Sequence, residues 1–581
     1  MSREEMEARG WDQLDVLFIS GDAYIDHPSF GVALLGRWLE AKGYRVGVVA
    51  QPGWDSLDDI ARMGRPRLFA GVTAGTLDSM LAHYTAFRKK RSDDAYTPGG
   101  RAGARPNRAS IVYANLARQA FPGLPIVLGG VEASLRRASH YDFWTDKIRR
   151  SLLLDSKADL LVYGMGERAI TEVADRLRDA GEERAPDTLH GIRGTAYAAS
   201  SLPEIAAEDL LELPSHEAIL ADPTALMTAT LAIERQVHQG KQWAAQACGG
   251  RQVIFTPPAA GLDTEAMDAL YAMPYTRNAH PAYAEPIPAA RMIQFSVTAH
   301  RGCAGGCTFC SITLHQGRDI QSRSADSIKE EVRAMTRHPE WNGSVSDVGG
   351  PTANMWGAYC ADDPSACRRP DCLTPKVCEH FRTKEPQLIE LLNSIKAMEG
   401  VKHLRIASGV RYDLNEDNGP YLRALVSEFV GGQLKIAPEH CSDKVLRLMR
   451  KPKFETFQAF LDLFQDESMS AGKEQYVSPY LITAFPGCTA EDMRGLAGWL
   501  EERGWRPQQV QCFIPTPGTV ATAMYHGEIT PHGTPIRVAK SDKARLKQHR
   551  ILMPDTGAPP GAGKGPYPKR RGKAKRLHAR R

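Results

Sequence analysis

The sequence predicts an α/β protein in two parts, a doubly wound parallel sheet followed by a partial (βα)6 barrel. In the N-terminal half, apolar runs such as Leu14–Ile19 and Arg45–Val49 alternate with helical stretches such as Val32–Lys42. Strands that alternate with helices are typical of parallel sheets. From Met292 onward the alternation occurs six times, and right-handed crossovers would curl six such units into a partial barrel.

The individual elements follow from the same alternation. Further N-terminal strands are predicted at Leu68–Val72, Pro125–Leu128 and Asp159–Tyr163. The six barrel strands are predicted at Met292–Val297, Ser344–Val348, Lys402–Ala407, Gln433–Ala437, Gln475–Thr483 and Gln509–Ile514. Helices are predicted between them at Ser324–Arg337, Gln387–Met398, Tyr421–Phe429, Phe454–Phe464 and Ala490–Glu502. In both fold types, functional sites lie at the C-terminal ends of the strands.

Composition divides the chain into four segments. Residues 11–202 form the doubly wound domain, residues 203–288 a helical connector interrupted by prolines, and residues 289–540 the barrel, with a cysteine-rich insertion at 355–380. Residues 541–581 form a basic C-terminal tail. Because the Gly/Pro/Lys/Arg composition after Asp555 cannot bury a core, we expect this tail to be disordered.

Composition and charge indicate a protein of the reducing cytoplasm. The first residues hold no apolar signal core, and no run approaches the length of a membrane span. The eleven cysteines are too sparse and too clustered for a disulfide scaffold, so metal or redox use is favoured. The net charge of +5 arises in the tail, where nine Lys and Arg residues and no acid follow Asp555. Global charge therefore does not argue for a nucleic-acid partner.

Three cysteines, Cys303, Cys307 and Cys310, lie on the loop that follows the first predicted barrel strand. Soft thiolates at this density select iron–sulfur clusters or zinc. An iron–sulfur cube normally takes four cysteines, so three would leave one iron open to another ligand. Zinc sites favour two separated pairs of ligands. The spacing therefore favours a cluster over zinc.

A second group of cysteines, Cys360, Cys367, Cys372 and Cys378, lies within the insertion after the second predicted barrel strand. Four thiols could hold zinc or an auxiliary cluster. Their irregular spacing matches neither the usual zinc pairs nor a ferredoxin run, and reduced structural thiols are the alternative.

The spacing Cys303-x3-Cys307-x2-Cys310, with Phe309 before the last cysteine, resembles the signature of the radical S-adenosylmethionine (SAM) superfamily. The resemblance implies a 4Fe-4S cluster whose open iron is chelated by SAM. It further implies that SAM is cleaved to methionine and a 5'-deoxyadenosyl radical, which abstracts a hydrogen atom from the substrate. An electron donor such as flavodoxin or ferredoxin would reduce the cluster.

The same resemblance assigns SAM contacts to the predicted strand ends. The segment Gly349-Gly350-Pro351 stands where the superfamily has a Gly-Gly-Glu-type turn that meets the SAM amino group. Proline replaces the acid here, so only backbone contact carries over. Ser408 and Arg411 resemble the pair that binds the ribose and carboxylate, and an arginine fork can grip a carboxylate with two hydrogen bonds. Glu439 ends the fourth strand, where a polar residue often contacts the ribose.

The N-terminal half resembles the cobalamin-binding-type Rossmann domain that precedes many radical SAM barrels. The resemblance depends on Gly129-Gly130 after one strand and Gly164-x-Gly166-Glu167 after another. The cobalt-binding pattern Asp-x-His-x-x-Gly is only approximated by Asp26-His27 and Gly31. We therefore expect a docking domain without a cofactor, and a loop position for His27, rather than cobalamin binding.

The order of motifs over residues 11 to about 550 resembles the YgiQ-type radical SAM proteins. The matching segments are Asp22–Phe30, Gly130–Ser134, Pro274–Arg277, Pro351–Met355 and Pro515–Pro517, together with both cysteine groups. The resemblance implies a radical SAM enzyme without identifying its substrate. One alternative is a non-catalytic protein that binds a cluster and SAM. Another is an RNA- or ribosome-related modification enzyme, supported by the basic loop Arg88–Arg108 and the tail. A third is a zinc-dependent nucleic-acid-binding protein.

Overall fold

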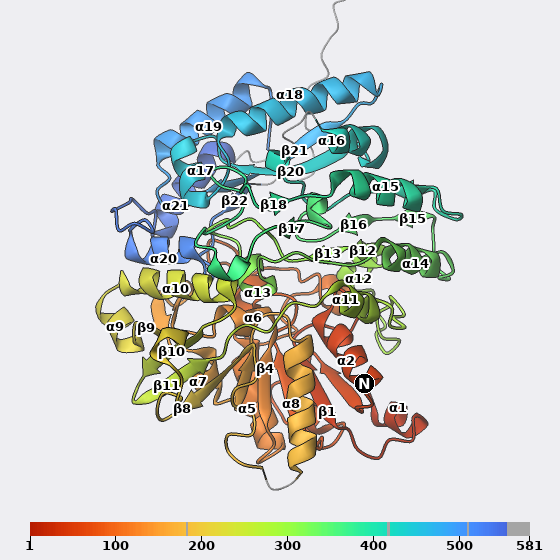
Figure 1. Ribbon diagram of the computed structural model, residues 1–581, viewed down its shortest axis with the longest axis vertical. Helices are drawn as coiled ribbons and strands as arrows, with labels where there is room; N and C mark the ends of the chain where they lie inside the picture. The colour runs from red at the N-terminus through yellow and green to blue at the C-terminus, as the bar shows by residue number, and fades with distance from the viewer. Residues whose placement is uncertain (182–183, 415–418, 508–509, 555–581) are drawn as a thin grey trace, which may run out of the picture.

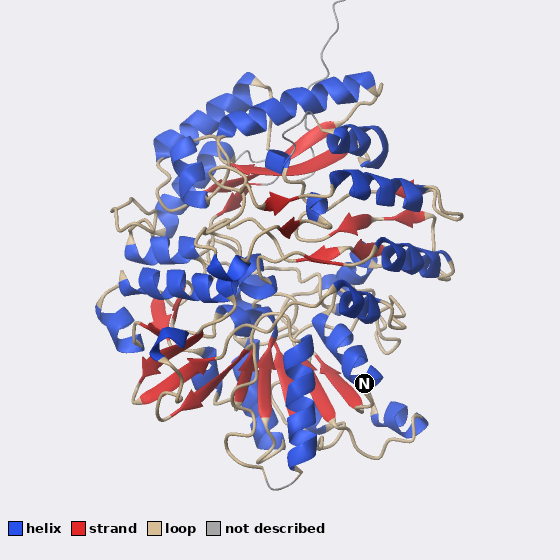
Figure 2. Ribbon diagram, viewed as in Figure 1, coloured by secondary structure: helices blue, strands red, loops and turns tan. Residues whose placement is uncertain are grey.

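The computed structural model describes residues 1–181, 184–414, 419–507 and 510–554. They form two α/β bodies, the N-terminal one at the bottom of Figure 1 and the C-terminal one above it. In Figure 2 the strands of the lower body rise toward the boundary between the two. Two α/β bodies in this order confirm the predicted fold class.

The lower body is built on one sheet with the strand order β2-β1-β3-β4-β7-β8-β11-β10-β9 within the described residues. The strands are β1 (Val16–Ser20), β2 (Val46–Ala50), β3 (Phe69–Thr73), β4 (Ile126–Gly129), β7 (Leu160–Val162), β8 (Thr195–Ala199), β9 (Leu210–Leu213), β10 (Trp243–Cys248) and β11 (Arg251–Phe255). The first five in spatial order are parallel, as predicted. Strand order 2-1-3-4 with helical crossovers is the doubly wound arrangement.

Alternate side chains of the central strands bury two separate cores, one on each face of the sheet. Leu17 and Ile19 pack with α5 (Ala109–Ala120), whereas Val16 and Phe18 pack with α8 (Glu167–Ala180). Because both faces are covered, these strands are continuous apolar runs.

The other helices of this body are α1 (Arg3–Ala8), α2 (Gly31–Ala41), α3 (Asp58–Ala61), α4 (Ser79–His83), α6 (Gly130–Leu135), α7 (Leu152–Ser156), α9 (His216–Ala221), α10 (Ala225–Gln239) and α11 (Thr264–Tyr271). A small hairpin, β5 (His140–Asp142) and β6 (Lys147–Arg149), leaves the sheet.

The prediction of a helical connector at residues 203–288 is wrong. Helix α10 is present, but β9, β10 and β11 from this segment extend the same sheet. Strands β10 and β11 form an antiparallel hairpin around Gly249 and Gly250, whose φ angles are +58° and +75°. A two-residue turn with both φ angles positive favours glycine. The pair of glycines therefore forms a hairpin turn.

The upper body contains the predicted barrel units, with strands paired in three parallel groups. These are β12 with β16, β15 with β19, and β20 with β21 and β22. Their bounds are β12 (Ser296–Thr298), β15 (Ser344–Val345), β16 (Asp347–Gly349), β19 (His403–Leu404), β20 (Gln433–Glu439), β21 (Tyr476–Thr483) and β22 (Val510–Cys512). The intervening helices are α14 (Ala325–Thr336), α15 (Glu385–Lys396), α16 (Pro420–Ala424) with the π-helical turn η6 (Leu425–Phe429), α17 (Asp443–Met449), α18 (Phe454–Ser470) and α19 (Ala490–Glu502).

The first predicted barrel strand begins later than expected. Residues Pro288–Ile293 form helix α12, and the strand itself is only Ser296–Thr298. Proline at the first helical position has a φ angle suited to a helix start, which outweighs the apolar run that follows. Gln509, the predicted start of the sixth strand, lies outside the described residues.

The C-terminal end of the described chain continues past the barrel as two helices, α20 (Val520–Gly527) and α21 (Asp542–Leu552). The prediction that residues from 541 onward are disordered is wrong for α21. Its anchor is a fully buried arginine, Arg545, which stacks 4.5 Å above the Phe143 ring and donates to the Phe513 carbonyl. A charged anchor leaves no apolar periodicity in the sequence.

Residues 555–581 lie outside the described residues. In the described ranges, no helix combines the length and hydropathy that a membrane span requires.

Candidate functional site

The three cysteines of the predicted cluster site lie on one loop between two short paired strands. Strands β13 (His300–Arg301) and β14 (Gln321–Ser322) close its base, and α13 (Ile312–Gln316) lies within it. Two glycines fix its path. A Cβ on Gly302, whose φ is +84°, would lie 2.0 Å from the Asp319 carbonyl oxygen, and a Cβ on Gly306 would lie 2.5 Å from the Asp371 Cβ. The loop therefore passes where side chains would not fit.

The electrostatic surroundings of the thiols favour a bound cation or metal. Burial raises the pKa of Cys310 to about 12, with neighbouring Cys307 adding to the shift. Burial also raises the pKa of Cys303, while the Arg411 guanidinium opposes that shift. Arg411 Nη1 donates to Cys307 Sγ at 3.7 Å. Metal binding deprotonates a buried thiol and removes this cost, so these side chains suit an iron–sulfur cluster.

Arg411 and Glu439, the residues predicted to contact SAM, both lie beside the cysteine loop. Arg411 Nε donates to Asp413 Oδ1 at 2.8 Å, and its Nη2 donates to the other carboxylate oxygen. The Arg411 guanidinium is therefore already bonded to Asp413 through Nε and Nη2, so this edge does not offer bidentate hydrogen bonds to a SAM carboxylate. Burial raises the pKa of Glu439, against the opposing effects of Lys451 and Arg411. Lys451 Nζ lies 3.9 Å from Glu439 Oε1.

The predicted residues Gly349, Gly350 and Ser408 meet at the ends of β16 and β19. A Cβ on Gly349 would lie 2.6 Å from Ser408 Oγ, and one on Gly350 would lie 2.6 Å from the His300 carbonyl oxygen. The Ser408 hydroxyl donates to Asp347, whose other oxygen accepts the Ala407 and Ser408 amides at 2.8 and 3.1 Å. Asp347 thus fixes the end of the third strand against the second.

Asp413, Lys451, Asp347 and His300 are site residues that sequence reasoning missed. Asp413 follows Arg411 by two residues, a spacing that could have suggested an ion pair. No local signal distinguishes Lys451, which follows α17 in the sequence, whereas Glu439 precedes that helix. Only the folded structure brings it to the site.

The second cysteine group is not gathered around one point. Among the described residues, no three His, Cys, Asp or Glu side chains are placed to hold a single metal ion, which applies to both cysteine groups. Cys360 is exposed on β17 (Tyr359–Cys360), which pairs with β18 (Phe381–Arg382). The Cys378 amide donates to the Cys372 carbonyl at 2.7 Å, and Arg318 donates to Cys372 Sγ at 3.3 Å. The insertion packs on the first cysteine loop through the Cys372 amide, which donates to the Ala304 carbonyl at 2.9 Å.

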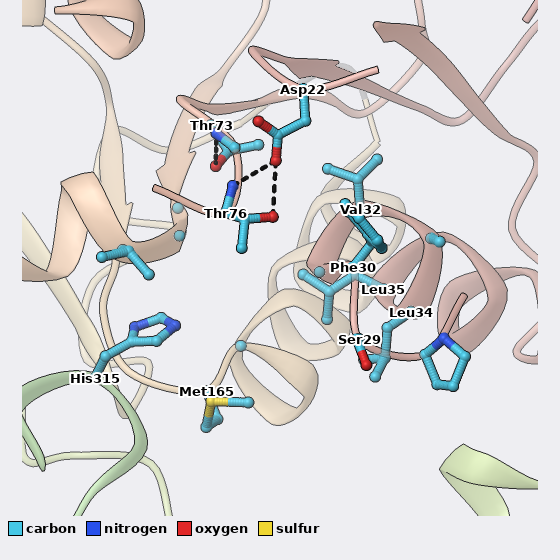
Figure 3. Close-up of a pocket in the computed structure, with 18 of the residues that line it drawn as sticks. Asp22, Ser29, Phe30, Val32, Leu34, Leu35, Thr73, Thr76, Met165 and His315 are labelled. Atoms are coloured by element: carbon cyan, nitrogen blue, oxygen red, sulfur yellow. Dashed lines mark hydrogen bonds between the residues drawn. The ribbon is translucent and has the colours of Figure 1, made fainter. Parts of the chain in front are cut away.

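A cavity of about 540 Å³ lies between the C-terminal edge of the large sheet and the barrel. Figure 3 shows Val32, Leu34 and Leu35 on one side of it and Met165 and His315 across from them. The barrel contributes, among others, Gly349, Gly350 and Ser408. Sequence reasoning missed this cavity because neither body encloses it alone.

His27 occupies the predicted loop position before α2, and its ring is engaged within the protein. Its Nε2 lies 3.0 Å from Arg277 Nη1, and its Nδ1 accepts the Ser29 amide at 3.1 Å. It is not among the residues that line the cavity.

The basic loop Arg88–Arg108 is exposed in part and tied into the fold in part. Its basic residues Lys89, Lys90, Arg91 and Arg101 are exposed. Arg105 is fully buried and pairs with Asp22 at 2.7 Å and Asp94 at 2.8 Å, and Arg108 pairs with Asp142 at 2.9 Å. Arg105 and Arg108 therefore serve the fold, and only the exposed residues of the loop present positive charge to a partner.

Comparison with known proteins identifies the family. Residues 1–296 match the family described as radical SAM N-terminal, and residues 297–500 match the radical SAM superfamily. A UPF0313 protein of Geobacter sulfurreducens is 48% identical over 558 residues, covering 95% of this chain and 91% of the relative. The chain belongs to the UPF0313 family of radical SAM proteins. A UPF0313 protein of Pseudomonas aeruginosa is 44% identical over 622 residues, covering 95% of this chain and 83% of the relative.

UPF0313 membership confirms the predicted resemblance to radical SAM proteins. It implies a 4Fe-4S cluster and SAM, and it supports an enzymatic role.

Among solved structures, the radical SAM methyltransferase TsrM from Kitasatospora setae, with cobalamin and a [4Fe-4S] cluster bound, is 12% identical with a TM-score of 0.49. The alignment covers 93% of this chain and 91% of that one. At this level of similarity, nothing about ligands follows for the UPF0313 protein.

Proposed function

We propose that this UPF0313 protein is a radical SAM enzyme in which Cys303, Cys307 and Cys310 bind a 4Fe-4S cluster and leave one iron to SAM. The observation that carries the proposal is the gathering of three half-buried cysteines beside Arg411 and Glu439 at the ends of the barrel strands. When bound, the cluster supplies the electron that cleaves SAM to methionine and a 5'-deoxyadenosyl radical for hydrogen abstraction from an unidentified substrate.

The protein's own residues hold and orient the reactants. The missing side chains of Gly349 and Gly350 let Ser408 and His300 pack closely against this turn, and its backbone is the part that would meet the SAM amino group. Ser408, fixed by Asp347, and Glu439 supply polar contacts for the ribose. Arg411, held by Asp413, keeps a positive charge beside Cys307 and so offsets the negative charge of the thiolates.

The electron donor would be a small redox protein such as flavodoxin or ferredoxin. All eleven cysteines are free thiols, which suits a reducing cytoplasm. The alternative of RNA modification keeps only the exposed basic residues of the loop, such as Lys89, Lys90 and Arg91, because Arg105 and Arg108 are committed to internal ion pairs.

The cysteine assignment is tested by iron content after anaerobic reconstitution. Serine variants of Cys303, Cys307 and Cys310 should each lose most of the iron that the wild type binds. Cys248→Ser, at a buried cysteine on β10 far from the loop in sequence, is the matched control and should retain it. Retention of wild-type iron by all three loop variants would contradict the proposal.

The second cysteine group is tested in the same experiment. If Cys360, Cys367, Cys372 and Cys378 are structural thiols, their serine variants should keep the wild-type iron and zinc content. Loss of about four further irons in these variants would instead assign an auxiliary cluster to the insertion.

A further inference from the structure

We propose that the cavity between the large sheet and the barrel is the substrate site, and that it takes a neutral, largely apolar small molecule bearing a hydrogen-bonding group. This inference builds on the proposed radical SAM function, because that function requires a substrate within reach of SAM.

The position of the cavity links the two bodies at the places where each is expected to bind ligands. On one side it is lined by the ends of β1, β3, β4 and β7 and by α2. Ligands of doubly wound sheets bind at this carboxyl edge. On the other side it is lined by Gly349, Gly350 and Ser408, the residues proposed to meet SAM. A molecule in the cavity would therefore lie next to SAM.

The size and lining of the cavity suit a small, mostly apolar molecule. Its volume of about 540 Å³ falls within the range of roughly 300–1,000 Å³ typical of small-molecule sites. The wall formed by α2 presents Val32 and Leu35, and Met165 lies across from them (Figure 3).

The charged side chains of the cavity wall already have partners. Asp22 pairs with buried Arg105 at 2.7 Å and accepts the Thr76 amide at 2.6 Å, as Figure 3 shows for Thr76. Glu167 pairs with Arg301 at 2.6 Å. The remaining carboxylate, Asp347, lies at the SAM end and is bound by Ser408. Asp347 accepts only neutral donors, so it keeps its negative charge at the SAM end, and elsewhere in the described lining the charged side chains are paired.

Two imidazoles are left for a ligand. His300 is fully buried and lines the cavity, yet neither ring nitrogen has a partner among the described residues. A buried polar group without a partner carries a desolvation cost that a ligand can remove. Burial holds the pKa of His300 at about 4, so the ring is neutral at pH 7 and offers one donor and one acceptor.

His315 presents a second ring to the cavity. Its Nδ1 lies 2.9 Å from Ser134 Oγ, which also accepts the Gly164 amide at 3.0 Å. Burial lowers the pKa of His315 to about 4, so this ring is neutral at pH 7 as well. The cavity thus combines an apolar wall with two neutral imidazoles, one of them held by Ser134, which is the complement of a neutral molecule with a polar group.

The location of the site is tested by binding of the neutral fluorophore N-phenyl-1-naphthylamine to the purified protein. Val32→Trp fills the cavity from α2 and should weaken binding at least tenfold. Val112→Trp, on α5 and outside the cavity lining, is the matched control and should change binding less than twofold. Equal effects of the two substitutions, or no effect of either, would overturn the assignment.

The class of ligand is tested by displacement of the fluorophore. 2-Naphthol, neutral and hydrogen-bonding, should compete at least tenfold better than the anion 2-naphthoate and better than 2-methylnaphthalene. His300→Phe should remove the advantage of naphthol over methylnaphthalene while leaving methylnaphthalene within twofold. Stronger competition by naphthoate would overturn the neutral class. If cobalamin displaces the fluorophore from the wild type and Val32→Trp abolishes that displacement, the neutral class is overturned in favour of a corrinoid site.

These measurements separate the two proposals. Intact, cavity-dependent binding in a protein that never cleaves SAM would refute the proposed function and leave the ligand class standing. SAM cleavage in a protein without cavity-dependent binding would refute the inference alone.

Discussion

Replacing Gly302 by alanine should dislodge the cysteine loop, whereas the same replacement at Gly317 should leave it in place. The two glycines flank the loop, and both have a φ angle of +84°. They differ in their surroundings. A Cβ on Gly302 would lie 2.0 Å from the Asp319 carbonyl oxygen, whereas a Cβ on Gly317 would have no neighbour within 4 Å. The pair therefore separates backbone strain from steric conflict.

The expected magnitudes follow from these two terms. Gly317 has φ +84° and ψ 177°, a backbone region that glycine alone commonly occupies. An alanine there costs about 1–3 kcal/mol, and this is the whole expected effect of Gly317→Ala. In Gly302→Ala the Asp319 carbonyl must also move by about 1 Å, and forcing atoms into a packed region adds about 1–3 kcal/mol. Gly302→Ala should therefore lower the free energy of unfolding by roughly 2–6 kcal/mol, and by more than Gly317→Ala does.

The assay combines urea unfolding of both variants with iron content after anaerobic reconstitution. Gly317→Ala should bind wild-type iron, and Gly302→Ala should bind less than half, because its backbone change is adjacent to Cys303. Equal losses of stability and equal iron in the two variants would refute the argument that close backbone approach positions the thiols.

Three further predictions concern the surroundings of the site. Asp413→Leu leaves the buried Arg411 charge without its partner and should lower the free energy of unfolding by about 3–5 kcal/mol. The double variant Arg411→Met/Asp413→Leu should recover at least half of this loss, and a loss below about 1 kcal/mol for Asp413→Leu in urea unfolding would contradict the prediction. Ser408→Ala should weaken SAM binding about tenfold in calorimetry, since Asp347 loses its hydroxyl partner; unchanged affinity would argue against Ser408. Burial holds the pKa of His140 and His440 at about 4, below the ordinary 6.5, so the unfolded chain binds more protons between these values. The free energy of unfolding should therefore fall as the pH drops from 6.5 toward 4, and it should fall less steeply in His140→Gln. A urea concentration at half-unfolding that stays constant over this pH range would contradict the assignment.

Elements encoded by local patterns could be predicted from the sequence. The parallel strands β1 to β4 are continuous apolar runs between helices, and the barrel helices follow capping residues such as Ser324 and Thr489. The cysteine triad could be located because its spacing is itself the signal. Arg411 and Glu439 could be located because each follows a strand whose end must point to the same edge of the barrel.

Features that depend on distant pairing could not be predicted. Strand β10 holds no β-branched residue, so its place in the sheet is decided by pairing with β9 and β11. Helix α21 is anchored by Arg545, which no apolar pattern reveals. The cavity exists only because the two bodies meet, and His300 became notable only once its lack of partners was visible.

The most direct test of the central claim is the formation of 5'-deoxyadenosine. The reconstituted, reduced protein is incubated anaerobically with SAM, and the product is quantified by mass spectrometry beside the triple variant Cys303/Cys307/Cys310→Ala. Our account predicts product from the wild type and none from the variant. A wild-type protein that holds its cluster, yet forms no product with either a chemical reductant or reduced flavodoxin, would contradict it and favour a non-catalytic protein that binds a cluster and SAM.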